Sequence, residues 1–339
     1  MNAKGRRPCT RNPNGLDTRL AEDTGRSAAS PREMPGAGWK QALVRTWKES
    51  SKDSIGLIAA GVAFYSFLAL VPLLGATVLT YGLVADLETV GAHIAALTEL
   101  LPRDVAPLIT EQLASVVETS GEKKGLGLLV ALAIALFGAR NAAGSIVSAL
   151  NIAYEEEERR GFFKVNLLAL AITVGAVTAA VIGMVGVGAM RFMHLALPTA
   201  AAATVSISKA LTYIVLGIAA ATGAALLYRY GPSRERPRWA WLTPGSILFA
   251  LAWVVLTIGF GIYVARFGSY GATYGSLGAV VVLLTWIYLT AYALLFGAEL
   301  NSELEHQTAR DTTSGPEKPL GARGAWAADH VASGEAAAE

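Results

Sequence analysis

Arg140 is the residue whose position most strongly indicates chemistry, because it is the only charged side chain in the apolar stretch 125–154. An arginine at the centre of a membrane-spanning helix costs roughly 3 kcal/mol on insertion scales, so it marks a functional site by default. Its guanidinium presents five donors in a rigid fork that fits a phosphate or a carboxylate. In the structural alternative, the same group caps carbonyl oxygens of a broken helix or pairs within the bundle.

Further polar residues accompany Arg140. In the first apolar stretch Tyr65 and Ser66 supply two hydroxyls, and Pro72 removes one helix hydrogen bond. Positions 141, 145 and 148 fall on one helical face, and Arg140 lies one position round from it. We expect these residues to form a substrate-binding site with Arg140. Its other members on the stretch 125–154 are Asn141, Ser145, Ser148 and Asn151.

Glu299 is the acidic residue to consider as a partner for Arg140, and we include it in the candidate site. Glu299 lies near the end of the sixth apolar stretch, whereas Arg140 is 14 residues from Tyr154, roughly 21 Å of helix rise. Direct pairing therefore requires the second helix to be broken or deeply tilted. Otherwise Glu299 and Asn301 are interpreted as an interfacial helix end.

The elements that must position these side chains are apolar helices. With 53% hydrophobic and 16% charged residues, the chain of 339 residues is too apolar for a soluble protein. Each apolar stretch exceeds or approaches the 20 or so residues needed to cross a bilayer core of about 30 Å. The predicted fold is all-α, a polytopic membrane protein with six transmembrane helices. The stretches are 55–84, 125–154, 165–190, 210–228, 240–265 and 267–298.

The distribution of Lys and Arg predicts the orientation in the membrane. These residues accumulate before the first stretch and in the connections 155–164 and 229–238, which should therefore face the cytoplasm. Both termini then lie in the cytoplasm. Residues 85–124 lie on the opposite side, where apolar residues at helical spacing predict an amphipathic helical insertion.

The ends of the chain are predicted to be disordered. Residues 1–38 are rich in Arg, Pro, Gly and Ser and lack the apolar core of a signal peptide. Residues 307–339 have a similar composition. The predicted organisation is therefore a cytoplasmic tail, a six-span membrane domain at 39–306, and a second cytoplasmic tail.

Several ordered motifs, spread over 40–306, resemble the YihY/BrkB family of bacterial inner-membrane proteins. The resemblance implies a six-helix protein of the bacterial inner membrane. The family has been labelled both a serum-resistance virulence factor and a ribonuclease. The motifs are Gly61-Val-Ala-Phe-Tyr-Ser-Phe-Leu-Ala-Leu-Val-Pro, Asn151-Ile-Ala-Tyr, Tyr230-Gly-Pro, Tyr274-Gly-Ser-Leu-Gly and Gly297-Ala-Glu-Leu-Asn.

The residues present argue against an enzyme. A metal-dependent nuclease needs clustered His and Asp ligands, but the four histidines are dispersed over two loops and the C-terminal tail. The single cysteine, Cys9, suggests no thiol chemistry. No phosphate-binding loop of an ATP-driven pump is present. We therefore expect no metal, no cofactor and no nucleic-acid partner.

The sequence favours a transporter or lipid-translocating protein for an anionic amphiphile or solute, with membrane lipids as partners. The lone arginine and the polar face beside it carry this interpretation. The alternative is a non-transporting scaffold for envelope assembly. A transporter should open a cavity beside Arg140, whereas a scaffold should bury that residue against carbonyls. The sequence does not indicate an oligomeric state.

Overall fold

The computed structural model describes residues 24–81, 126–196, 202–267 and 276–332, whose regular secondary structure is helical apart from one isolated β-bridge. The predicted insertion at 85–124 lies outside the described residues. Within these residues six helices are long and apolar enough to cross a membrane, which confirms the all-α polytopic fold. The helices are α2 (Gly36–Lys52), α3 (Ile55–Tyr81), α6 (Leu126–Ala153), α7 (Phe162–Ala196), α8 (Ala202–Tyr230), α9 (Trp239–Phe267), α11 (Ser276–Gln307) and α12 (Trp326–Asp329).

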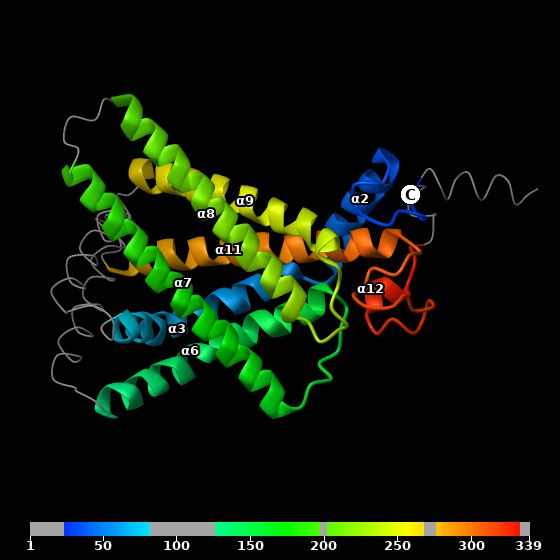
Figure 1. The fold of residues 1–339 in the computed structure, drawn as a ribbon, viewed down its shortest axis with the longest axis horizontal. Helices are drawn as coiled ribbons and strands as arrows, with labels where there is room; N and C mark the ends of the chain where they lie inside the picture. The colour runs from blue at the N-terminus through cyan, green and yellow to red at the C-terminus, as the bar shows by residue number, and fades with distance from the viewer. Residues whose placement is uncertain (1–23, 82–125, 197–201, 268–275, 333–339) are drawn as a thin grey trace, which may run out of the picture.

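Helix α11 is the centre of the bundle (Figure 1). It packs against α9, α3, α6 and α2, and α12 contacts its end. Helix α7 packs on α6 and α3, and α8 packs on α9, so α7 and α8 lie at the outside. The apolar core joins α3, α6, α8, α9 and α11 around buried residues such as Leu150, Tyr228 and Leu295.

One end of the bundle gathers the charged connections, and we call it the charged end. There α2, the connection between α6 and α7, the connection between α8 and α9, and the C-terminus of α11 meet, on the right of Figure 1. The large apolar side chains elsewhere are often exposed, among them Leu57, Ile134 and Val255. Such a surface fits lipid rather than water, because large exposed apolar patches mark contact surfaces.

The chain beyond Gln307 differs from its prediction. Residues 308–332 are packed on the charged end, with Thr312 and Ala327 fully buried and the short helix α12 within them. The prediction of disorder is therefore wrong for this C-terminal segment. The N-terminal tail also packs from residue 24 onward: Ala28 and Met34 are buried, and Ala309 donates a backbone hydrogen bond to Arg26.

Helices α9 and α11 approach each other closely at two glycines. A Cβ added to Gly245 would overlap the carbonyl oxygen of Gly297, and one added to Gly297 would lie 2.6 Å from the Tyr228 hydroxyl. The absence of both side chains lets the two backbones touch. Pro244, just before Gly245, leaves α9 continuous, since α9 runs from Trp239 to Phe267.

We predict that Gly245→Ala destabilises the protein by about 3 kcal/mol or more, because the obstacle is backbone that cannot rotate away. The matched control is Gly259→Ala in the same helix, where an added Cβ meets no atom within 4 Å. That substitution should be neutral or slightly stabilising, since alanine favours a helix over glycine. Thermal unfolding in detergent measures both. Equal unfolding temperatures for the two variants would refute the close-approach argument.

Candidate functional site

Arg140 lies near the middle of the span formed by α6. Its Nη1 donates a hydrogen bond to Oδ1 of Asn166 on α7, and its guanidinium lies 4.3 Å from the centre of the Phe137 ring. Its Nε is buried and has no hydrogen-bond partner in the structure. Asn166 is held in turn by the carbonyl of Phe162, which accepts a bond of 2.8 Å from Nδ2. Arg140 is therefore held by a neutral amide and an aromatic ring.

The predicted hydroxyl residues do not join Arg140 through hydrogen bonds within the described segments. Ser145 Oγ donates to the carbonyl of Ala142, and Ser148 Oγ donates to the carbonyl of Gly144. Both hydroxyls thus serve their own helix, a common behaviour of serine within helices. Asn141 is exposed, Ser66 is half-buried, and the exposed ring of Tyr65 packs edge-on against Phe64.

Asn151 belongs to a different group of residues, at the charged end. Its Oδ1 accepts a hydrogen bond of 2.7 Å from the backbone N–H of Ser233, and its Nδ2 donates to Glu158 at 3.0 Å. Arg160 binds the same carboxylate at 2.7 Å, and hydrogen bonds from Arg160 lower the pKa of Glu158 to about 2. Asn151 therefore ties the end of α6 to the connection between α8 and α9.

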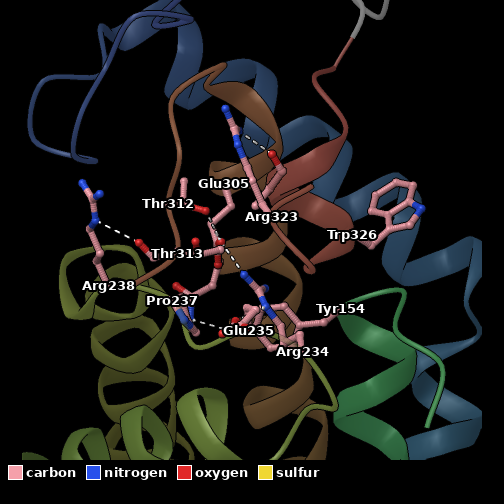
Figure 2. Close-up of polar contacts among 12 residues, drawn as sticks. Tyr154, Arg234, Glu235, Pro237, Arg238, Glu305, Thr312, Thr313, Arg323 and Trp326 are labelled. Carbon is pink, nitrogen blue, oxygen red and sulfur yellow. Dashed lines mark hydrogen bonds and ion pairs between the residues drawn. The ribbon is translucent and has the colours of Figure 1, made fainter. Parts of the chain in front are cut away.

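The centre of the charged end is a fully buried ion pair between Arg234 and Glu305. The two side chains are 2.6 Å apart, and neither is exposed. The Thr312 hydroxyl donates to Glu305 Oε2 at 2.7 Å, and the guanidinium lies 5.0 Å from the centre of the Tyr154 ring. Figure 2 shows Arg234 pointing to Glu305 beside Tyr154. We call Tyr154, Arg234, Glu305 and Thr312 the buried network.

In the buried network, electrostatics keep the Arg234 guanidinium charged and the Tyr154 phenol neutral. Burial lowers the pKa of Arg234, but the Glu305 carboxylate raises it, and the net shift is upward. Burial raises the pKa of Tyr154 strongly, and the charge of Glu305 adds to it. The guanidinium thus stays charged while the phenol stays protonated. Arg234 Nη1 and Glu305 Oε1 remain buried without hydrogen-bond partners in the structure.

The C-terminal segment closes the charged end through backbone as well as side-chain contacts. The N–H of Trp326 donates to Glu156 Oε1 at 2.6 Å, and Arg238 Nε donates to the carbonyl of Thr313 at 3.0 Å, as Figure 2 shows. Pro237 and Thr313 form an antiparallel bridge. Arg310, Lys318 and residues between Ala309 and Arg323 line an open pocket of about 510 Å³ in this segment.

Helix α2 is attached to α11 by a second ion pair. Arg45 Nε lies 2.5 Å from Glu303 Oε2, and Arg45 Nη2 donates to Gln307 Oε1 at 2.7 Å. Glu299, one turn before Glu303, is only 2% exposed, and its Oε1 has no hydrogen-bond partner in the part of the chain that the structure describes. The acids that act most strongly on Glu299 are Asp53, Glu303, Glu49 and Glu155. No interaction within the described segments joins Glu299 to Arg140.

Comparison with known proteins assigns the chain to a family. The model of the virulence factor BrkB family matches residues 46–321. The chain belongs to the BrkB family. No solved structure matches the chain.

Two curated relatives of the chain cover different lengths. A putative ribonuclease-like protein, YfkH of Bacillus subtilis (strain 168), is 27% identical over 190 residues, which are 55% of this chain and 69% of the relative. A UPF0761 membrane protein of Rhodospirillum centenum (strain ATCC 51521 / SW) is 27% identical over 297 residues. That match covers 84% of this chain but only 61% of the relative.

Three of the motifs that resemble the BrkB family converge on the charged end. Asn151 holds Ser233, just beyond the motif that begins at Tyr230. Asn301 Nδ2 lies 3.4 Å from the Tyr154 hydroxyl, and its Oδ1 accepts from the N–H of Gly245 at 2.7 Å. The motifs thus fix how the helix ends lock together, and Asn151 takes part in that contact. Its predicted role in substrate binding stays a prediction.

Sequence reasoning missed three residues that matter in the structure. Arg234 was counted only as a topology-determining charge, and Glu305 lies two residues before the C-terminal tail that was predicted to be disordered. Asn166 had a detectable signal, because it is the only amide in the apolar stretch 165–190. A lone amide near the end of one span is the expected kind of partner for a lone arginine in the next.

Proposed function

We propose that this integral membrane protein transports or translocates an anionic amphiphile or solute, and that Arg140 binds the anionic group. The observation that carries the proposal is the charge of Arg140 at mid-span. None of the ion pairs among the described residues includes this side chain. A guanidinium at membrane depth is costly, and an amide dipole offsets only part of that cost.

The surroundings of Arg140 favour an amphiphile over a soluble solute. Phe137, whose ring covers the guanidinium, is 64% exposed on the surface of α6. Ile134, one turn earlier, is 68% exposed. An anionic headgroup therefore reaches the arginine from the lipid side while its acyl chains stay in the hydrocarbon. The Nε is buried and unpartnered in this structure, and it becomes a donor for the headgroup when the Phe137 ring moves off the guanidinium. Guanidinium bonds to phosphate are charge-assisted.

The proposal includes location and orientation. The protein lies in the bacterial inner membrane, with the charged end and both termini in the cytoplasm, because Lys and Arg gather in the connections of that end. The alternative function is a scaffold for envelope assembly. It is favoured by the buried network, which locks the helix ends together and restricts motion there.

The test is translocation of fluorescent lipids in vesicles that contain the purified protein. We expect anionic phosphatidylglycerol labelled on its acyl chain to cross the bilayer faster than phosphatidylcholine with the same label. Arg140→Ala should slow the anionic lipid about tenfold or more, which corresponds to one lost charge-assisted bond of roughly 1.5–3 kcal/mol. Arg140→Lys should recover part of the rate, because lysine keeps the charge but loses the fork.

The matched control is Arg32→Ala, which removes an exposed arginine outside the spans. Thermal unfolding of each variant in detergent separates binding from folding. A stable Arg140→Ala protein with the full rate would contradict the binding role. Wild-type protein that moves neither lipid would favour the scaffold.

A further inference from the structure

Glu299 is a buried acid that has no cationic partner among the described residues. It lies in α11, it is 2% exposed, and its Oε1 forms no hydrogen bond. The resolved ion pairs use Glu303, one turn away, with Arg45, but none of them uses Glu299. An isolated carboxylate in a low-dielectric interior is very costly, so the group must be accompanied by a positive charge or be neutral.

The neighbours of Glu299 supply negative charge. Antiparallel packing of α2 on α11 brings Gln41 to Gln307, 3.0 Å apart, and Arg45 to Glu303. Glu49 lies four residues after Arg45 on α2, and Glu299 lies four residues before Glu303 on α11. The antiparallel packing therefore places Glu49 opposite Glu299. The charges that act most on Glu299 are those of Asp53, Glu303, Glu49 and Glu155.

The basic side chains near Glu299 already interact with other groups. Arg45 lies on Glu303 and Gln307, and Lys52 binds Glu49 at 2.7 Å. His306 lies 3.8 Å from Glu303. Outside the spans, burial and then Glu49 raise the pKa of Asp53, and burial raises the pKa of Glu155. No group of three or more acids or histidines among the described residues has the geometry of a metal site.

We propose that Glu299 is a proton-binding site, which holds one proton on its carboxyl group and passes it along α11. The proton neutralises the only buried acid of the α2 interface that lacks a cation in the described structure. This inference rests on the proposed transport function only for its second half, the use of the proton to drive movement of the substrate.

A route for the proton follows one face of α11. Positions 288, 292, 299, 303 and 306 fall within about 60° of one another on a helix of 3.6 residues per turn. They carry two phenols, two carboxyls and an imidazole, which are groups that accept and donate protons. A Cβ added to Gly56 would lie 3.5 Å from the Tyr288 hydroxyl, so this face of α11 borders the start of α3. Chains of such groups inside membranes are typical of proton relays.

Infrared spectroscopy of the full-length protein in lipid tests the site without any transport assay. A protonated carboxyl shows a C=O stretching band that a carboxylate lacks. We expect this band at pH 7 in the wild type, its loss in Glu299→Gln, and its retention in Glu303→Gln. The control lies on the same helix face, one turn away, and its carboxylate is paired with Arg45.

A second variant covers the case in which Glu299→Gln fails to fold. Glu299→Asp keeps the acid and should shift the frequency of the band rather than remove it. Glutamine is close in shape to a protonated glutamate, so Glu299→Gln should also unfold at nearly the wild-type temperature. A wild type without the band at pH 7, or a band that persists unchanged in both Glu299 variants, overturns the proposal.

Transport in vesicles with an imposed pH gradient tests the coupling. In Glu299→Gln the anionic lipid should still exchange, but the rate should no longer respond to the gradient. Arg140→Ala should lose exchange and keep the infrared band. The band without any lipid movement would contradict the proposed function and leave the proton site standing, whereas gradient-driven movement in Glu299→Gln would refute the coupling.

Discussion

Glu305→Gln is expected to destabilise the protein by about 3–5 kcal/mol, because it leaves the Arg234 guanidinium buried without an anion. The pair is 0% exposed on both sides, so water cannot replace the lost partner. Glutamine retains the size of the side chain and can still accept from the Thr312 hydroxyl, so the change removes little except the charge. Thermal or denaturant unfolding in detergent should show a much lower midpoint.

The chain offers a control with the same substitution. Glu235 pairs with Lys318 at 3.6 Å, but the side chains are 52% and 37% exposed. Exposed pairs contribute about 0–1 kcal/mol, so Glu235→Gln should leave the midpoint almost unchanged.

A double variant separates charge from packing. Arg234→Met combined with Glu305→Leu removes both charges, and it should be more stable than either single change, since apolar replacement of a whole buried pair is often neutral. If Glu305→Gln unfolded at the wild-type temperature, the ion pair would not contribute to the stability of the protein.

Deletion of residues 308–339 is expected to cost at least about 3 kcal/mol and to abolish monodisperse protein in detergent. The deletion removes the Thr312 hydroxyl from Glu305 and the Trp326 N–H from Glu156. Each of these is a hydrogen bond to a charged group, worth roughly 1.5–3 kcal/mol. The deletion also uncovers the Arg234–Glu305 pair. Size-exclusion chromatography and thermal unfolding provide the measurement.

Deletion of residues 333–339 alone is the control for this truncation. It leaves every contact of the C-terminal segment described here in place, so the elution profile and midpoint should match those of the whole chain. A fully stable protein ending at Gln307 would mean that the segment packs on the bundle without supporting it.

Hydropathy was enough to predict the spans. The six apolar stretches correspond to α3, α6, α7, α8, α9 and α11, because a helix must satisfy its backbone within itself when it crosses lipid. Most boundaries agree within a few residues. Helix α11 continues to Gln307, nine residues past the predicted stretch, because its last turns are polar but buried by α2 and the C-terminal segment.

The candidate site was harder to predict than the fold. Arg140 was found because a charge in an apolar stretch is visible in sequence. The partner of Arg234 was not, since Glu305 lies 71 positions away along the chain. Composition misjudged the C-terminal segment for a different reason, because hydrogen bonds rather than apolar burial hold it: Arg323 alone donates to the carbonyls of Ala309, Arg310 and Ala328. A segment held by such bonds needs little apolar surface to be ordered.

The contacts between the two ends of the chain impose an order on its biosynthesis. The ribosome delivers residues from the N-terminus at about 5–20 per second, so all six spans are made before Thr312 and Trp326 emerge. Until then Glu305 lacks the Thr312 hydroxyl, and Glu156 lacks the Trp326 N–H. Residues 24–35 likewise lack the C-terminal segment, which binds them through the Ala309 N–H. A prematurely terminated chain would therefore display an open, charged surface.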